Sequence, residues 1–242
     1  MKKAIFYLLL LISINVNAGS VPGYVPTNGL LAFWSFNANA DNEAGNSLYH
    51  GVVYGATLTN DRFGNAQSAF SFDGNDKIEI GNVGLGAINT SYTYMAWFKT
   101  SSINTSNRTI MSDYDSNTGD DINYACWNYL DANTAARSEI KNSPNVYGVT
   151  SSSGMNNGVW HQLITVIDRN SNTIKQYVDA IFIGSTTMPS NINFNTDGFL
   201  RFGVHKWNNQ FQTQSFWIGE LDDIAIWNRV LTTQEITGLY NA

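Results

Sequence analysis

The apolar positions of this chain fall in short runs, separated by clusters of Asn, Gly, Ser, Thr and Asp. Apolar residues at helical spacing are almost absent before the C-terminal tail. Short apolar runs bounded by turn-forming residues are typical of β-strands joined by polar turns. The pattern therefore predicts an all-β chain with strands at Leu30–Phe36, Gly51–Tyr54, Ala69–Phe72, Lys77–Ile80, Tyr92–Phe98, Thr109–Asp113, Tyr124–Tyr129, Trp160–Asp168, Ile174–Val178, Ile181–Thr186, Leu200–Phe202 and Phe216–Trp227.

The C-terminal tail has a different pattern. Thr232-Thr233-Gln234-Glu235 matches a capping box, in which the first Thr and the Glu side chains each accept a hydrogen bond from the backbone of the other. Ile236, Leu239 and Tyr240 follow at helical spacing. We expect one short helical turn there.

Two connections have the residues of tight hairpins. Phe72–Lys77 places Asp-Gly and Asn between two alternating runs, and Asp168–Thr173 places Asn and Ser between two others. About twelve short strands in one chain of this length predict two packed sheets. No linker or internal repeat divides the sequence into smaller domains.

The N-terminal segment has the pattern of an export signal. Lys2 and Lys3 precede an apolar run at residues 4–14, and Ala18 closes a small-residue cleavage site. The run is too short for a stable membrane anchor, and no later stretch is apolar enough to span a bilayer. We expect a signal peptide at residues 1–18 and a single domain at residues 19–242, which would place the protein outside the cell, either secreted or at the cell surface.

Charge limits the classes of partner, and the cysteine content limits the possible disulfides. The chain holds 13 basic and 19 acidic residues, a formal net charge of −6, and loss of the two signal lysines would make this 11 against 19, or −8. The basic residues are scattered rather than gathered in a stripe, which argues against nucleic acid as a partner. The single cysteine, Cys126, has no second cysteine to pair with and is expected to be a small buried apolar residue.

Five blocks of sequence carry a family resemblance. They are Gly29–Asn37 with Asp41–Asn46, Arg62–Ala66 with Phe70–Asp76, Tyr92–Lys99, Gly158–Gln162 running on to Tyr177–Asp179, and Gly219–Leu231. In this order they resemble the laminin-G-like bacterial domains of the concanavalin A-like lectin and glucanase superfamily. The resemblance implies a two-sheet antiparallel jelly-roll sandwich. It leaves the function open, because this fold carries both lectins and glycosidases.

The tryptophans divide into two groups. Trp34, Trp97, Trp160 and Trp227 lie inside apolar strand runs, where we expect them to fill the core between the sheets. Trp127 and Trp207 instead lie beside amide or imidazole side chains, and this combination offers a sugar a stacking surface and hydrogen bonds. The predicted carbohydrate site consists of Trp127, Tyr129, His205, Trp207 and Asn208. Asn is abundant along the whole chain, so a coincidental neighbourhood remains the alternative.

The resemblance also implies a structural calcium ion on the outer face of the sandwich, where the first strand region meets the last long strand. Calcium binds about six to eight oxygens from carboxylate, amide and backbone groups. Carried onto this sequence, the ligands are Asn37, Asp41, Asp73, Asp222 and Asp223, with Glu43 and Asp76 as further candidates. Asn37 stands where the family often has Asp, which removes one charge. Alternatively, Asp222 and Asp223 only bond backbone groups, and the remaining acids form turns.

Catalytic signatures are incomplete. Retaining glycosidases need two carboxylates about 5–5.5 Å apart, and glucanases of this superfamily carry theirs in the pattern Glu-x-Asp-x-x-Glu. Glu220 and Asp222 match the first two positions, but Ala225 occupies the last. The three histidines lack the paired spacing of zinc ligands. The sequence therefore favours a binding protein over an enzyme.

Three functions remain, and each predicts a different surface. A carbohydrate- or glycoprotein-binding module predicts exposed aromatic rings beside amide groups. A cell-surface adhesion or protein-interaction domain predicts an exposed apolar patch. A polysaccharide-degrading glycosidase or lyase predicts a groove with two carboxylates, or a cluster of Tyr, His and a basic residue, with shifted pKa values.

Overall fold

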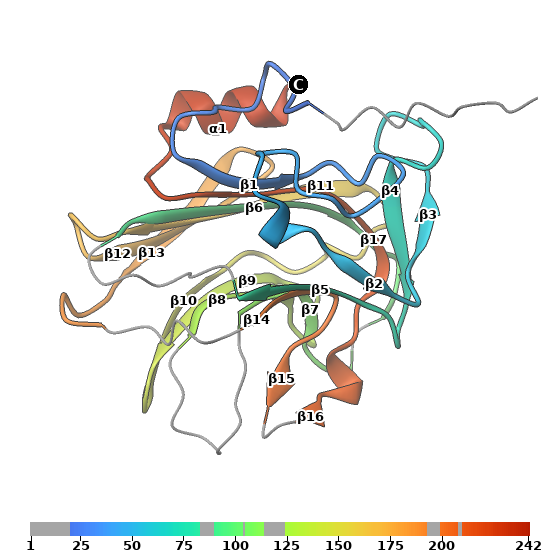
Figure 1. Ribbon diagram of the computed structural model, residues 1–242. Coiled ribbons are helices and arrows are strands. Elements are labelled where there is room, and N and C mark those ends of the chain that lie inside the picture. The colour runs from blue at the N-terminus through green and yellow to red at the C-terminus, as the bar shows by residue number, and fades with distance from the viewer. Residues whose placement is uncertain (1–19, 83–89, 104, 114–123, 193–198, 208–209) are drawn as a thin grey trace, which may run out of the picture.

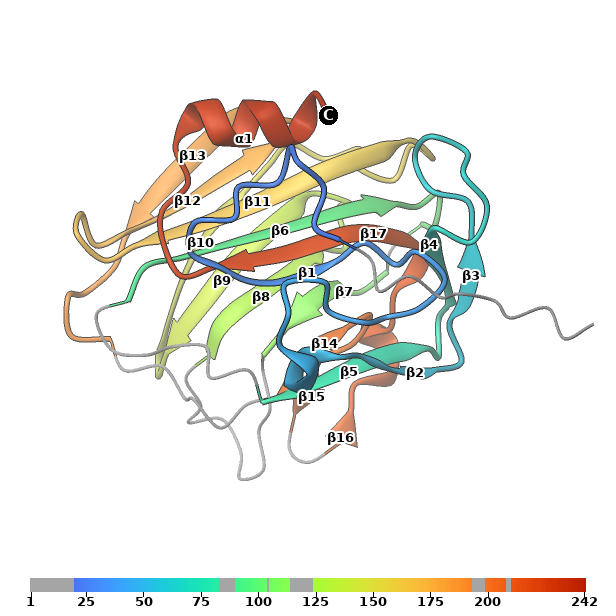
Figure 2. The same cartoon turned by 45° about the horizontal axis from the view of Figure 1, so that its top comes forward.

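The computed structural model describes residues 20–82, 90–103, 105–113, 124–192, 199–207 and 210–242. Two antiparallel sheets pack face to face as a sandwich, and one short helix lies on the outside of the upper sheet (Figures 1 and 2). The all-β jelly-roll sandwich expected from the sequence is confirmed. The expected signal peptide lies outside the described residues, so it stays a prediction.

The larger sheet has eight strands. Seven follow one another in space in the order β13 (Ile181–Thr187), β12 (Thr173–Val178), β11 (Trp160–Asp168), β6 (Tyr92–Lys99), β17 (Ile218–Trp227), β4 (Ala69–Asp73) and β3 (Thr57–Thr59), and β1 (Leu30–Trp34) also pairs with β17. The longest of these strands, β17, runs through the middle of the sheet and closes the fold near the end of the chain.

The smaller sheet has seven strands, in the order β10 (Asn145–Thr150), β9 (Ala136–Asn142), β8 (Tyr124–Leu130), β7 (Arg108–Ser112), β14 (Phe199–Phe202), β5 (Lys77–Asn82) and β2 (Val52–Tyr54). A two-stranded ribbon, β15 (Lys206–Trp207) with β16 (Gln210–Phe211), projects from the outer side of this sheet (Figure 1). Two short 3-10 helices, η1 (Ser47–Tyr49) and η2 (Thr213–Ser215), complete the described elements together with α1 (Thr233–Tyr240).

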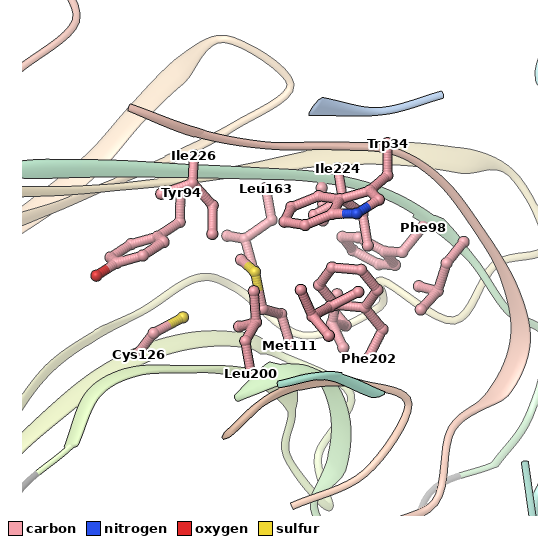
Figure 3. Packing of buried hydrophobic residues seen from close by; sticks show 14 of the residues in the cluster. Trp34, Tyr94, Phe98, Met111, Cys126, Leu163, Leu200, Phe202, Ile224 and Ile226 are labelled. Atoms are coloured by element: carbon pink, nitrogen blue, oxygen red, sulfur yellow. The ribbon is translucent and has the colours of Figure 1, made fainter. Parts of the chain in front are cut away.

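The core between the sheets is built by strand alternation. On β6, Tyr94 and Phe98 point inward, while Met95 and Trp97 point to the outer face. The inward side chains meet those of the opposite sheet, as Figure 3 shows for Trp34 and Phe202, whose rings meet edge to face with centroids 5.1 Å apart. The free cysteine, Cys126, is buried in this core as expected.

Helix α1 seals the outer face of the eight-stranded sheet. The capping box predicted from the sequence is present, with the Thr232 hydroxyl accepting from the Glu235 backbone and Glu235 accepting from the Thr232 backbone. Ile236 and Leu239 pack against Trp227 on that face. No helix among the described residues is both long enough and apolar enough to cross a membrane.

The tryptophans expected in the core occupy different layers. Trp34 lies between the sheets, but Trp227 lies under α1. Trp97 points outward and stacks on the Tyr240 ring, with centroids 5.6 Å apart. Trp160 is only half-buried. The expectation was wrong for these last three residues, because it followed apolar runs without deciding which face each residue takes.

One of the two predicted hairpins is wrong. Asp168 pairs with Thr173 across the β11–β12 turn, as expected. In contrast, β4 pairs with β17 while β5 pairs with β14, so Phe72–Lys77 carries the chain from one sheet to the other. Apolar residues do alternate on each side of the turn, but those of β4 face the core from the eight-stranded sheet and those of β5 face it from the seven-stranded sheet.

Candidate functional site

An aromatic pair lies on the outer face of the seven-stranded sheet. Trp127 and Tyr129 are two residues apart on β8 and therefore face the same way, and their rings stack with centroids 4.2 Å apart. Asn128, between them, faces inward, where its side-chain oxygen accepts a hydrogen bond of 2.8 Å from Thr165 of the other sheet. This bond between the sheets fixes which face of β8 is turned outward.

The hydroxyl of Thr109 on β7 joins this pair to His205. The Trp127 indole donates to Thr109 Oγ1 over 3.1 Å, and the same oxygen lies 3.1 Å from His205 Nδ1. Because the Thr109 oxygen accepts from the indole, its own hydrogen is available to Nδ1, which favours a neutral imidazole with its proton on Nε2. Burial lowers the pKa of His205 to about 4, so the ring is uncharged at neutral pH.

Tyr129 is held by residues that do not line the pocket. Its hydroxyl donates to Glu139 Oε1 over 2.8 Å, and Arg137 lies 3.5 Å from the same oxygen. Burial raises the pKa of the Glu139 carboxyl and the pKa of the Tyr129 hydroxyl. The Tyr129 ring is thus buried and supports Trp127 by stacking, rather than forming an exposed surface.

The β15–β16 ribbon completes a pocket above these rings. Trp207 on the ribbon is 39% exposed. Gln212 holds the ribbon in place, because its side-chain amide donates to the backbone oxygens of Trp207 and Gln210 over 3.1 and 3.2 Å. The pocket has a volume of about 350 Å³ and is lined by Ser106, Asn107, Trp127, His205, Trp207, Gln212, Gln214 and Ser215.

The structure brings together most of the predicted carbohydrate site. Trp127, His205 and Trp207 line the pocket, and Tyr129 lies beneath Trp127. Asn208 lies outside the described residues. Sequence reasoning missed the five polar lining residues, Ser106, Asn107, Gln212, Gln214 and Ser215. Nothing in their local sequence distinguishes them from the many other polar loop residues. Ser106 and Asn107 come close to β8 because they precede its neighbour β7, whereas the other three follow the β15–β16 ribbon.

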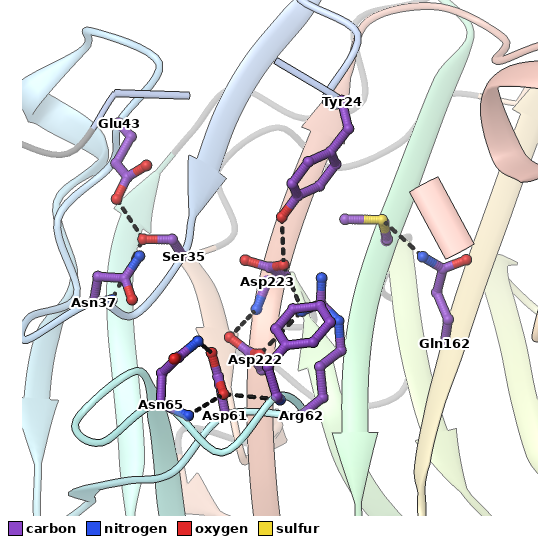
Figure 4. A network of polar contacts seen from close by, with 12 residues as sticks. Tyr24, Ser35, Asn37, Glu43, Asp61, Arg62, Asn65, Gln162, Asp222 and Asp223 are labelled. Atoms are coloured by element: carbon purple, nitrogen blue, oxygen red, sulfur yellow. Dashed lines mark hydrogen bonds and ion pairs between the residues drawn. The ribbon is translucent and has the colours of Figure 1, made fainter. Parts of the chain in front are cut away.

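A second polar cluster lies on the outer face of the eight-stranded sheet (Figure 4). The pairing of β17 with β6 shifts between Asp222 and Ala225, and Asp223 has a φ of +37°. This bulge lets two consecutive carboxylates, those of Asp222 and Asp223, reach the same guanidinium. Arg62 Nη1 lies 3.1 Å from Asp222 Oδ2 and 2.6 Å from Asp223 Oδ2.

The predicted calcium ligands lie at separate places in the structure. Asn37, Asp222 and Asp223 line one pocket of about 180 Å³. Asp41 lies elsewhere and is 3.5 Å from His50, and Asp73 accepts a bond from its own turn at Asn75. The two further candidates have other partners, since Glu43 accepts from Ser35 and Asp76 accepts from the Asp73 backbone.

The cluster fits a calcium ion poorly, because an arginine already lies on its carboxylates. Burial raises the pKa of both Asp222 and Asp223, and the charge of Arg62 opposes that rise. Across the described part of the chain, no three His, Cys, Asp or Glu side chains are arranged to hold a metal ion. Calcium therefore stays a prediction from the sequence, and the geometry of Arg62 argues against it.

The incomplete glucanase pattern does not form a carboxylate pair facing a groove. Glu220 lies 3.4 Å from Lys99 Nζ, Asp222 is in the arginine cluster, and Ala225 is buried under α1. His161, also isolated in the sequence, bonds Asp179 over 2.7 Å. These contacts are internal to the sheet and its connections.

Comparisons with known proteins agree with the fold. A profile of the family described as the concanavalin A-like lectin/glucanases superfamily matches residues 72–237, which is more than half of the chain. None of the curated proteins compared with the chain matches its sequence. Among solved structures, domain 4 of AbnA, a GH43 extracellular arabinanase from Geobacillus stearothermophilus in complex with arabinotriose, has a TM-score of 0.63 at 20% identity, covering 87% of this chain and 98% of that chain.

Two toxin domains are also similar. The binding domain of Botulinum neurotoxin DC in complex with SialylT has a TM-score of 0.66 at 14% identity, and the binding domain of Paraclostridial Mosquitocidal Protein 1 has a TM-score of 0.71 at 12% identity. Each match covers 89% of this chain but 52% of the toxin domain, so this chain spans about half of their length. Another structure of the first toxin domain contains rat synaptotagmin II. At these identities the likeness shows the fold alone.

Proposed function

The chain belongs to the concanavalin A-like lectin/glucanase superfamily, and from this premise we propose that it is an exported, non-catalytic module that binds carbohydrate in the pocket between β8 and the β15–β16 ribbon. The observation that carries the proposal is a single pocket lined by an exposed indole, Trp207, a half-buried indole, Trp127, and several amide and hydroxyl side chains. The C–H faces of a sugar ring can stack on the indoles, and its hydroxyls can bond the amide and hydroxyl side chains.

The charge of the lining residues supports one class of sugar over others. All eight lining residues among those described are uncharged at neutral pH, because burial keeps His205 neutral. An acidic sugar would bring a carboxylate or sulfate into this pocket without a cation to pair with, and burying an unpaired charge is costly. Side-chain amides both donate and accept, which suits the hydroxyls of a neutral sugar. We therefore expect uncharged glycans to bind in preference to sialylated, uronic or sulfated ones.

A binding screen of the purified protein tests this function. Neutral polysaccharides such as arabinan, xylan, mannan and β-glucan would be compared with polygalacturonate, alginate and a sialylated glycan by calorimetry. We expect at least one neutral glycan to bind without release of product, and its affinity to change little with salt, since no ion pair is involved. Binding confined to the acidic glycans would contradict the neutral-sugar proposal, and release of shorter sugars would favour the enzyme.

Trp207→Ala connects the binding to the pocket. The ring is exposed and on a ribbon, so its loss should leave the fold intact while lowering glycan affinity by about 10- to 100-fold, or roughly 1.4–2.8 kcal/mol. Phe182→Ala is the matched control, because Phe182 is an aromatic residue with 53% exposure on β13 of the other sheet. Equal affinities of the two variants and the unchanged protein would place the binding site elsewhere.

Protein binding is the second candidate, and one surface favours it. Strand β13 is at one edge of the eight-stranded sheet, and its Ile181 and Phe182 are 66% and 53% exposed. The later part of β13 packs against β10, where Thr186 bonds Gly148, but apolar side chains at the exposed start of an edge strand are suited to contact with another protein. If no glycan binds, a partner lost with Phe182→Ala and retained with Trp207→Ala would support adhesion through this edge.

A further inference from the structure

The arginine cluster has a consequence independent of the proposed binding pocket. Asp222 and Asp223 are 2% and 8% exposed, and two adjacent carboxyl groups buried to this degree can both be ionised only if a cation lies close by. In proteins that cation is either a metal ion or a basic side chain. Here the nearest positive group is the guanidinium of Arg62, which is itself only 6% exposed.

Arg62 lies on the loop between β3 and β4, and this loop places its side chain against Asp222 and Asp223. Asp61 organises this loop, because its Oδ1 accepts from the backbone of Phe63 and Asn65 over 2.9 and 2.8 Å. The guanidinium then lies between two aromatic faces, 4.3 Å from the Phe63 ring centroid and 4.6 Å from that of Trp97. Arginine is suited to such a place, since its planar group stacks on rings while its edge bonds carboxylates.

The carboxylate oxygens are largely committed to protein donors. Asp222 Oδ1 accepts from the Asp223 backbone over 2.8 Å, and Asp222 Oδ2 accepts from Arg62. Asp223 Oδ2 accepts from both Arg62 and the Tyr24 hydroxyl, the latter over 3.1 Å. A calcium ion needs about six to eight free oxygens at about 2.3–2.6 Å, and it cannot approach these oxygens while a guanidinium bonds them.

We propose that Arg62 is the built-in counterion of the Asp222–Asp223 pair and takes the place that a divalent cation would otherwise fill. The domain then folds without calcium. Removing the guanidinium turns the pair, together with the amide of Asn37 in the same pocket, into an acceptor for a divalent cation.

The first test measures the melting temperature of the purified protein in about 5 mM calcium chloride and in about 5 mM EDTA. A ligand that binds only the folded state raises this temperature. We expect the two values to agree to about 1 °C. A clear rise in calcium, or a fall in EDTA, would overturn the proposal, because the native protein would then hold a metal ion that Arg62 does not replace.

The second test uses Arg62→Ala. Loss of one partner from a buried ion pair should lower the melting temperature by roughly 10 °C in EDTA. Calcium at about one hundred times its dissociation constant should then restore about 5–11 °C. Terbium, which luminesces when excited through a nearby indole such as Trp97, would report binding directly. An Arg62→Ala protein indifferent to both ions would overturn the assignment of the pair as a cation acceptor.

Two further variants separate the cation site from general destabilisation. Lys175→Ala removes a cation that lies 3.1 Å from the single carboxylate of Asp168 near the end of the same sheet, and it should create no calcium response. Arg62→Ala combined with Asp223→Asn keeps the cavity but removes one charge, so its calcium response should be weaker than that of Arg62→Ala alone. An equal or stronger response would contradict the proposed ligands.

Discussion

Thr109→Val should weaken both the fold and the candidate pocket, because it removes one hydroxyl and leaves the shape of the side chain almost unchanged. Thr109 is fully buried, so the substitution opens no cavity. What it loses are the hydrogen bonds to the Trp127 indole and to Nδ1 of His205, each 3.1 Å long.

The magnitude follows from those two bonds. A buried neutral hydrogen bond contributes about 1 kcal/mol net, so the free energy of unfolding should fall by about 2 kcal/mol. For a domain of this size, that corresponds to a melting temperature lower by about 4–8 °C. If the proposed pocket binds a glycan, its affinity should fall as well, because the Trp127 and His205 rings lose the hydroxyl that fixes their positions relative to each other.

Urea unfolding followed by tryptophan fluorescence measures the first effect, and calorimetry with the glycan measures the second. Thr186→Val is the control, since the Thr186 hydroxyl makes one bond of 2.7 Å to the Gly148 backbone away from the pocket. It should cost about half as much stability and leave binding unchanged. A loss below about 0.5 kcal/mol for Thr109→Val would refute the role given to the bridge.

Three other substitutions test single features. Burial lowers the pKa of His205 from 6.5 to about 4, so the unfolded chain binds this proton first and stability is lost as the pH falls from 6.5 through 4. His205→Gln should reduce this loss, measured as the urea midpoint at each pH. Identical pH profiles of the variant and the unchanged protein would contradict the argument. Arg229 holds the pKa of Glu235 at about 2 rather than 4.5, so its contribution is complete above pH 4.5 and disappears as the pH falls through 2. Glu235→Gln should therefore cost about 1 kcal/mol at pH 7 and almost nothing at pH 2. Gly203 has a φ of +87°, and an added Cβ would lie 2.8 Å from the Phe72 ring. Gly203→Ala should therefore lower the free energy of unfolding in urea by about 3 kcal/mol, and a loss under about 1 kcal/mol would show that the ring can move.

Strands whose residues are mostly apolar were predictable from the sequence. The runs that became β6, β11 and β17 are rich in apolar residues and end at polar turns, so local pattern was enough. Strands β9 and β10 were missed because Ala136–Asn142 has too few apolar positions to count as a run, and because Gly148 interrupts the apolar residues of Asn145–Thr150. Their place in the sheet comes from the pairing of β9 with β8 and of β10 with β9, which no local pattern contains.

The residues of the candidate pocket were predictable where single side chains have distinctive chemistry. Trp127 and Trp207 were recognisable as aromatic groups among polar neighbours, although they are far apart in the chain. Arg62 was not recognisable as the partner of Asp222, because the contact depends on a loop joining two strands at the other end of the sequence. Sequence supplies the acids, but only the fold shows which charge balances them.

Helix α1 and the pocket lie on opposite faces of the sandwich, with α1 over the eight-stranded sheet and the β15–β16 ribbon below the other (Figures 1 and 2). The backbone leaves α1 at Asn241 and Ala242, and the end of the chain lies on the opposite side of the sandwich from the β15–β16 ribbon (Figure 1). A dye, a resin or a second protein joined after Ala242 would therefore leave the pocket unobstructed. Molecules immobilised in this way would all present the same face to a solution of glycans, so a sensor chip prepared through that end should retain its full capacity.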